Sequence, residues 1–252
     1  MKQLTLLLLG LILFSCTSDS DEPVKEVSLS LAFAHNWDGT SVTKDEFNKL
    51  DYTNKKGTKM SITKLRYLIS RIKLTDSANN VIEFDGYKLV DLSDNATLSH
   101  RLTKLVKEGA YKLSCTFGFS NADNKDGVYQ DLNSANWNVP SQLTGGYHYM
   151  QLEGKFKNTS LVELGYSYHA IKAYNPTTKV SKDTSFEIDL GTITLKGDAT
   201  ATINMNIAEW FKNPNEWDLE TKNSGLMMNY DAQIQMSDNG KSGVFSLGGV
   251  QQ

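Results

Sequence analysis

Apolar and polar positions alternate with a period of two along most of this chain. Between residues 27 and 33, valine, leucine and phenylalanine occupy the odd positions, and serine or alanine occupies the even ones. This alternation is typical of a strand with one buried face. Further strands are expected over residues 62–74, 81–84, 87–90, 111–119, 147–156, 161–173, 186–195 and 199–207, and glycine, asparagine or aspartate marks most of the gaps.

Helical patterns are scarce, and the clearest ones are short, at residues 44–50, 102–107 and 207–212. Many strands with few helices predict an all-β fold, an antiparallel β-sandwich with long loops and few short helices. The stretch from Ser120 to Thr144 has no clear period. Because loops of this length in compact domains are usually functional or mobile, we expect this one to do more than connect two strands.

The first sixteen residues are typical of a bacterial lipoprotein signal. Lys2 precedes the apolar stretch Leu4–Phe14, which is too short to span a bilayer as a helix, and Ser15 stands directly before Cys16. We therefore expect residues 1–15 to be removed and Cys16 to carry lipid, with an ordinary secretory signal as the alternative. Lipid chains on Cys16 would anchor the protein to a membrane without a spanning helix.

Residues 16–26 are predicted to be a tether, because this polar and acidic run cannot bury enough surface to fold. An acidic run at this place resembles the surface-export signal of some bacterial lipoproteins. It indicates the outer membrane, on either its periplasmic or its cell-surface face.

Residues 27–252 form one predicted domain, since no linker or block of charge divides them. The net charge of −3 gives no electrostatic argument for binding nucleic acid. Lipidation of Cys16 would leave Cys115 as the only other cysteine, so no internal disulfide is expected. Cys115 alternates in phase with Leu113 and Phe117, which predicts a buried core thiol rather than a nucleophile.

The segment Gly145–Met150 carries the most informative candidate chemistry. As part of a strand, it would place His148 and Met150 on one face, because side chains two residues apart point the same way. Imidazole and thioether together suit copper better than a hard cation. By the same parity, Glu153 falls on the opposite face and is expected to be a surface charge.

The other histidines are ambiguous when each is taken alone. His35 ends the first strand and His169 lies in a later one, and single histidines in such places more often pack than bind metal. His100 lies in a polar segment and is expected at the surface. Three histidines from separate strands could form a metal site in a β-sandwich, but sequence spacing does not show that they converge. The close-spaced zinc motifs, the nucleophile elbow and the nucleotide-binding glycine patterns are absent.

Several segments, taken in order, resemble one family. They are His35–Gly39, Tyr52–Asn54 with Gly57, Ile62–Ser70, Gly109–Tyr111, Phe117–Phe119, Pro140, Gly145–Met150, Leu152–Gly154 and Tyr168–His169. Together they resemble the MbnP-like family, copper-binding β-domains of the periplasm or cell surface related to the methanobactin-associated protein. The resemblance covers nearly all of the chain after the tether.

The resemblance implies a copper-binding protein rather than an enzyme. His35 and His169 match histidines of the family pattern, and His148 matches a variant of its glycine–tyrosine motif. In characterised relatives, a dihaem peroxidase-like partner oxidises a tryptophan to kynurenine, which then helps to bind copper. In this chain Val139–Leu143 stands where two tryptophans are expected, and Trp137 is close to them but out of register.

We therefore predict a lipid-anchored protein that binds one copper ion through His35, His148 and His169, with Met150 as a weak soft ligand. The metal would be held for uptake, storage or handover, and zinc is left open. The expected partners are a membrane, through the lipid anchor, and a dihaem peroxidase-like protein or an outer-membrane receptor. The alternative is a surface module without metal, whose aromatic strands and Ser120–Thr144 loop bind a glycan or a protein.

Overall fold

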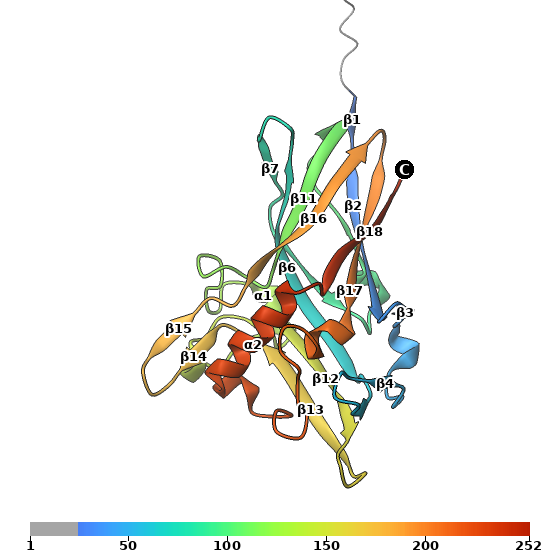
Figure 1. Ribbon diagram of the computed structural model, residues 1–252. Coiled ribbons are helices and arrows are strands. Elements are labelled where there is room, and N and C mark those ends of the chain that lie inside the picture. The colour runs from blue at the N-terminus through green and yellow to red at the C-terminus, as the bar shows by residue number, and fades with distance from the viewer. Residues whose placement is uncertain (1–24) are drawn as a thin grey trace, which may run out of the picture.

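Two β-sheets face each other in the computed structural model, which describes residues 25–252 (Figure 1). The predicted signal peptide, the lipidation of Cys16 and most of the tether fall outside these residues. Within the described part of the chain, no helix is long and apolar enough to cross a membrane.

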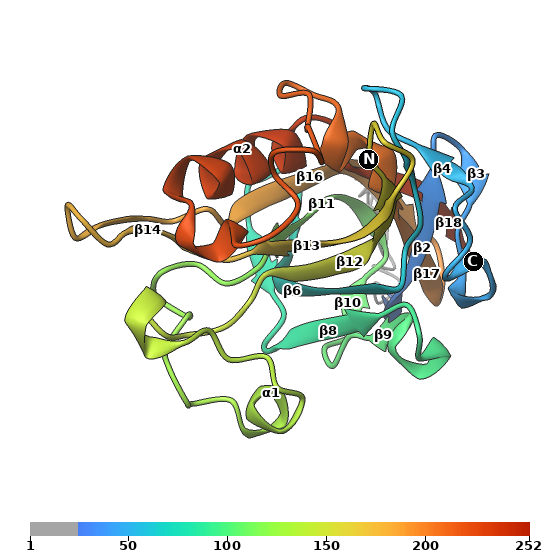
Figure 2. The ribbon, with the colours of Figure 1, turned by 90° about the horizontal axis from the view of Figure 1, so that it is seen from below.

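The larger sheet has nine strands, with the long strand β6 at its centre. Its strands are β4 (Tyr52–Thr53), β5 (Lys59–Met60), β6 (Lys64–Thr75), β7 (Val81–Glu83), β8 (Tyr87–Asp91), β11 (Gly109–Phe117), β12 (Met150–Lys157), β13 (Glu163–Ala170) and β16 (Phe186–Leu195). The smaller sheet consists of β2 (Leu29–Trp37), β3 (Thr40–Ser41), β9 (Ser99–Arg101), β17 (Ala199–Asn206) and β18 (Phe245–Gln251). Seen from below, β2 and β17 close one side of the curled larger sheet (Figure 2).

The remaining elements are short. Two small pairs of strands are β1 (Glu26–Val27) with β10 (Val106–Lys107), and β14 (Ala173–Asn175) with β15 (Val180–Lys182). The α-helices are α1 (Gln130–Ser134) and α2 (Tyr230–Lys241), and the 3-10 helices are η1 (Lys44–Glu46), η2 (Asn95–Thr97), η3 (Ser141–Leu143), η4 (Ile207–Phe211) and η5 (Leu226–Met228).

The register around β12 decides which side chains share a face. β12 pairs antiparallel with β6 on one edge and with β13 on the other. Gln151 lies between Arg66 and His169, and the neighbouring Met150 lies between Tyr67 and Ala170. Because alternate residues point to opposite faces, the residues beside Gln151 face outward and those beside Met150 face the core between the sheets.

The predicted β-sandwich is confirmed, and its core lies where the alternation indicated. Along β2 every odd residue is buried, and the side chain of Phe33 meets that of Tyr67 from the opposite sheet. Cys115 is buried as predicted. One pairing departs from the antiparallel rule, because β17 runs parallel to β2. All strands of the larger sheet lie between β2 and β17 in the sequence, and a connection of that length permits parallel pairing.

One predicted helix was wrong, and one observed helix was not predicted. Residues 102–107 form a turn and strand β10, because Val106 pairs with Val27 and this buried contact overrides a weak helical pattern. Helix α2 was missed, since its buried face contains Ala232, Gln233 and Met236 and carries little apolar contrast.

Candidate metal centre

The loop before β12 folds back and brings Trp137 beside His148. Residues 137–139 run antiparallel to residues 146–148, and Asn138 forms an isolated β-bridge with Tyr147. The amide of His148 donates a hydrogen bond of 3.0 Å to the carbonyl oxygen of Trp137, and the short helix η3 closes the connection. The two residues are therefore neighbours in space although eleven positions separate them in sequence.

The double glycine makes this path possible. Gly145 and Gly146 both have left-handed backbones, with φ of 66° and 77°. The amide of Gly146 donates to Asp126 Oδ1 over 3.2 Å, and the next amide donates to Asn124 Oδ1 over 2.8 Å. A Cβ atom on Gly146 would lie 2.5 Å from that asparagine oxygen, so a glycine is required there. The long loop thus fixes the backbone that leads into His148.

His148 presents a buried nitrogen lone pair. Its side chain is nearly inaccessible, and its Nδ1 lies 2.9 Å from the carbonyl oxygen of Trp137. A carbonyl oxygen only accepts, so Nδ1 carries the proton and Nε2 carries the lone pair. Nε2 has no hydrogen-bond partner among the described residues. Burial lowers the pKa of His148 from 6.5 to about 4, which keeps the ring neutral at physiological pH.

His169 is held by a carboxylate on the neighbouring strand. Its Nε2 lies 2.8 Å from Glu153 Oε1, and because a carboxylate accepts, Nε2 donates, which in the neutral ring places the lone pair on Nδ1. Lys64 Nζ lies 3.0 Å from the same oxygen. The hydrogen bond from His169, aided by Lys64, lowers the pKa of Glu153 to about 2. The His148 and His169 rings are 5.4 Å apart between centroids, at 85° to each other.

Trp137 and Arg66 cover the histidine pair. The indole ring of Trp137 is fully buried, 5.7 Å from the His148 ring between centroids, and the guanidinium carbon of Arg66 lies 5.0 Å from the indole centroid. Arg66 Nη2 donates to Gln151 Oε1 over 2.6 Å. Among the described residues, six buried side-chain N or O atoms have no partner, and three of them are here: His148 Nε2, Trp137 Nε1 and Arg66 Nε. Such atoms are rare in folded proteins, so three in one place indicate a site.

A cavity of about 490 Å³ opens beside this cluster. Lys64, Arg66, Gln151 and Glu153 all line it. Glu153, which orients His169, is therefore within reach of solvent, whereas His148 is buried.

The structure brings two of the three predicted histidines together. His35 Nε2 lies 3.1 Å from the hydroxyl of Tyr67, which follows Arg66 in β6 and points to the core face. The larger sheet therefore separates His35 from the pair His148 and His169. Within residues 25–252, no group of three or more His, Cys, Asp or Glu side chains is arranged to hold a metal.

The prediction that His148 and Met150 share a face was wrong. β12 begins only at Met150, and Tyr149 is a bend, so the alternation that holds along the strand does not extend back to His148. The thioether of Met150 lies on the core face beside Tyr67. The same miscounted parity put Glu153 on the far side from His148, whereas it contacts His169 and lies on the outer face with both rings.

Sequence reasoning missed the polar residues around the pair. Arg66, Gln151 and His169 lie side by side only because of the register of β6, β12 and β13, and nothing in their sequence spacing indicates it. The sequence did indicate one pair: Glu153 lies two residues after Gln151, so their side chains are expected on the same face of the strand.

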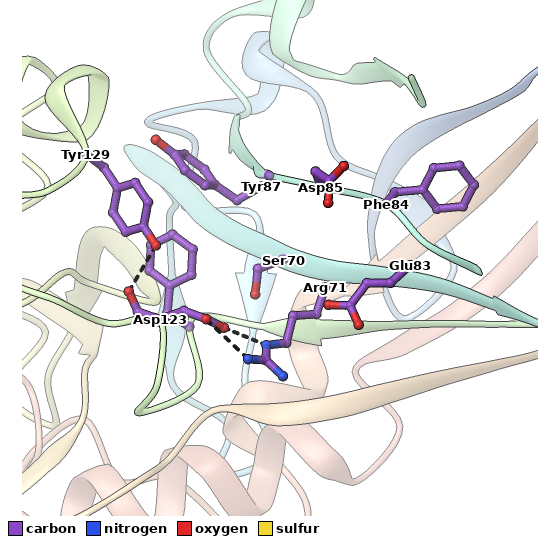
Figure 3. A pocket seen from close by; sticks show the side chains of 10 residues that line it. Ser70, Arg71, Glu83, Phe84, Asp85, Tyr87, Asp123 and Tyr129 are labelled. Atoms are coloured by element: carbon purple, nitrogen blue, oxygen red, sulfur yellow. Dashed lines mark hydrogen bonds and ion pairs between the residues drawn. The ribbon is translucent and has the colours of Figure 1, made fainter. Parts of the chain in front are cut away.

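A second cavity, of about 270 Å³, lies between β6, the β7–β8 turn and the long loop (Figure 3). Arg71 has a left-handed backbone, with φ of 47°, and donates from Nε and Nη2 to the two carboxylate oxygens of Asp123, at 2.5 and 3.2 Å. Tyr87 and Tyr129 line the cavity across from Glu83. Asp123 and Tyr129 both belong to the Ser120–Thr144 loop, whose length predicted a role beyond connecting two strands.

Comparison with known proteins identifies the relatives of this fold. The family model for MbnP matches residues 26–229. Among solved structures, MbnP from Methylosinus trichosporium superposes with a TM-score of 0.59 at 15% sequence identity, covering 89% of this chain and 99% of that one. At this identity the likeness concerns the fold. A search of curated proteins found no match.

Proposed function

Because the chain belongs to the MbnP family, we propose that it binds one copper ion at His148 and His169. The protein would be held at the outer membrane by lipid on Cys16 and would take up, store or hand over the metal. No catalytic reaction is part of the proposal. One observation carries it: two imidazole rings lie side by side, and one nitrogen of each ring bonds to an oxygen acceptor, which leaves the other nitrogen for a metal.

The tautomers are those that metal binding requires. In many metal sites, a ligand histidine donates its other ring N–H to a carbonyl or a carboxylate, which fixes the ring and raises its basicity. Trp137 supplies the carbonyl for His148, and Glu153 supplies the carboxylate for His169. Nε2 of His148 and Nδ1 of His169 would then be the two nitrogen atoms that coordinate the metal. A buried nitrogen without a partner is costly, so the fold bears that cost at His148.

The separation of the two rings also suits a shared ion. Imidazoles that hold one metal at about 2.0–2.1 Å per nitrogen have ring centroids about 4 to 6 Å apart, depending on the angle at the metal. The observed 5.4 Å falls inside this range. Nitrogen ligands suit copper and zinc alike, and the family favours copper.

The surroundings favour an ion of low charge. Arg66 and Lys64 place two cations beside the pair, and Glu153 supplies one carboxylate. Neutral ligands in a partly buried, cationic environment compensate a single charge better than a double one. We therefore expect copper(I) to bind more tightly than copper(II).

Trp137 is the tryptophan that the family chemistry would act on in this chain. It is out of register in the sequence, yet its ring lies next to that of His148. A dihaem peroxidase-like partner that oxidised it would add a ligand on the covered side of the pair, next to His148. The intact mass of the purified protein, with and without that partner, tests this part separately.

Metal titration of the chain carrying Cys16→Ser, with elemental analysis and chelator competition, tests the proposal. We expect one copper ion per chain and loss of binding in the double variant His148→Ala, His169→Ala. His100→Ala, which changes a histidine on β9, is the matched control. The proposal fails if the unmodified site takes up no copper, or if the double variant binds it as well as the control does.

A second function is favoured by the cavity in Figure 3, where tyrosines lie near Arg71 and three carboxylates. Aromatic rings beside planar polar groups suit a sugar, so a glycan-binding module remains the alternative. Binding to a glycan array that is abolished by Arg71→Ala and unaffected by His148→Ala would support it.

A further inference from the structure

A third cavity, of about 330 Å³, lies on the other side of the larger sheet from the histidine pair. It opens at the edge of β2, in the gap between the short strands β9 and β3. The amide of Phe33 donates to the carbonyl oxygen of Leu98 at one end of this gap, and the amide of Val42 donates to that of His35 at the other. Between these two bonds, no strand within residues 25–252 pairs with the edge of the sheet. The gap leads inward to His35.

Tyr67 determines the tautomer of His35. The Tyr67 side chain is fully buried, and its hydroxyl has one partner among the described residues, His35 Nε2 at 3.1 Å. Burial raises the pKa of Tyr67 well above its ordinary value, so the hydroxyl keeps its proton. A buried hydroxyl proton is donated to the acceptor at hand, which here is Nε2. His35 therefore carries its own proton on Nδ1.

This leaves a donor in the cavity without an acceptor. No described residue accepts a hydrogen bond from Nδ1, and His35 is 5% exposed while it lines the cavity. Burial also lowers the pKa of His35 to about 4, so the ring is neutral near pH 7. Nδ1 is not one of the fully buried atoms that lack a partner among the described residues, so it is reached through the cavity, and an acceptor that enters can take this hydrogen bond in place of water.

The cavity has a mixed lining with an apolar part and a polar part. Its apolar side chains are Phe33, Val42, Leu92 and Leu98, and its polar or charged ones besides His35 are Ser41, Thr43, Lys44, Asp45 and Asn95. Lys44 from η1 lines the mouth and makes no ion pair within the described part of the chain. Apolar side chains combined with a few polar groups are the usual construction of a small-molecule site.

We propose that this cavity binds a small apolar molecule with a neutral hydrogen-bond acceptor, such as a ketone or ester carbonyl, which accepts from His35 Nδ1–H. A neutral acceptor fits better than a carboxylate, because the ring beside it is uncharged and the carboxylate of Asp45 already lines the cavity next to Lys44. This site is independent of the copper proposal, since β6 and β12 separate the two. It gives a role to the one family-pattern histidine that the histidine pair leaves out.

The test compares three probes of similar size on the chain carrying Cys16→Ser, in the absence of copper. Acetophenone has a neutral acceptor, ethylbenzene has none, and benzoate carries a charge. Binding is followed by titration in ¹H–¹⁵N spectra, which also report the Nδ1–H of His35 directly. We expect acetophenone to bind about tenfold more tightly than ethylbenzene and more tightly than benzoate, and to shift the Nδ1–H signal.

Two variants check that the cavity is the site. His35→Phe should remove the preference for acetophenone over ethylbenzene, and Leu98→Trp should weaken both by filling the cavity, while His100→Phe should change neither. Equal affinity of the unmodified chain for acetophenone and ethylbenzene would overturn the proposal, and so would tightest binding of benzoate. These comparisons need no variant, so they stand even if His35→Phe fails to fold.

Discussion

Acidification should destabilise the copper-free protein steeply between pH 6.5 and pH 4, because two buried histidines resist protonation. His35 and His148 both have pKa values of about 4 in the folded chain, lowered from 6.5 by burial. The unfolded chain binds protons at these residues from about pH 6.5 downward, whereas the folded chain does so only near pH 4. Stability is therefore complete above pH 6.5 and is lost as the pH falls through this window.

The magnitude follows from the shift in pKa. Each histidine should cost roughly 2 kcal/mol by pH 5 and roughly 3 kcal/mol by pH 4, relative to pH 7. Together they amount to a large part of the roughly 5–15 kcal/mol that stabilises an ordinary domain. Acid unfolding above pH 4 is the expected result, before most carboxylates are protonated.

Urea unfolding followed by tryptophan fluorescence at pH 7, 6, 5 and 4.5 measures this loss, because three of the four tryptophans are fully buried. His35→Gln and His148→Gln should each remove about half of the pH dependence, and His100→Gln should remove much less. The reasoning is refuted if the free energy of unfolding stays level from pH 6.5 to pH 4.5. It is also refuted if a chain carrying both His35→Gln and His148→Gln loses as much stability over this range as the chain without them.

Three further outcomes are expected. Glu153→Gln should weaken copper binding about 10- to 100-fold in chelator competition, since it removes the carboxylate that orients His169; an unchanged affinity would mean that this contact has no part in the site. Gly146→Ala should lower the free energy of unfolding in urea by about 1–3 kcal/mol and also reduce copper uptake, because its Cβ would clash with Asn124 of the loop. Gly127→Ala is the control, since Gly127 has an equally left-handed backbone but open space around it, and it should cost only about 1 kcal/mol. Cys115, whose pKa burial raises to about 12, should react with a thiol reagent only after unfolding, and rapid labelling of the native chain would contradict its burial.

The sequence predicts those parts of the fold in which a single physical constraint acts along the strand. β16 was placed at its observed bounds because one of its faces packs on the core while the other meets water. Strand pairing is different in kind, because it depends on residues far apart in the chain. The position of His35, behind β6 rather than beside His169, follows from which strands lie between them, and no local pattern contains that information.

The residues of the candidate site could be placed only in part for the same reason. His148 and His169 were identified by residue type and by family resemblance, and the structure brings them together. The error at Met150 came from applying strand parity across a bend, and Trp137 looked misplaced because sequence register ignores the fold-back of residues 137–148. Both failures occur where the backbone leaves regular structure, which is also where functional residues tend to gather.

The bend at Tyr149 gives the site its properties. Regular strand geometry through this residue would direct His148 to the core face with Met150, where the packed interior would exclude an ion. The bend directs it instead to the outer face, under Trp137, where its lone pair is shielded from water but adjoins residues that line an open cavity. A metal ligand needs both conditions, because burial keeps the imidazole neutral and an opening lets the ion arrive. The glycine pair and the loop that holds it are therefore as much a part of the proposed copper site as the two rings.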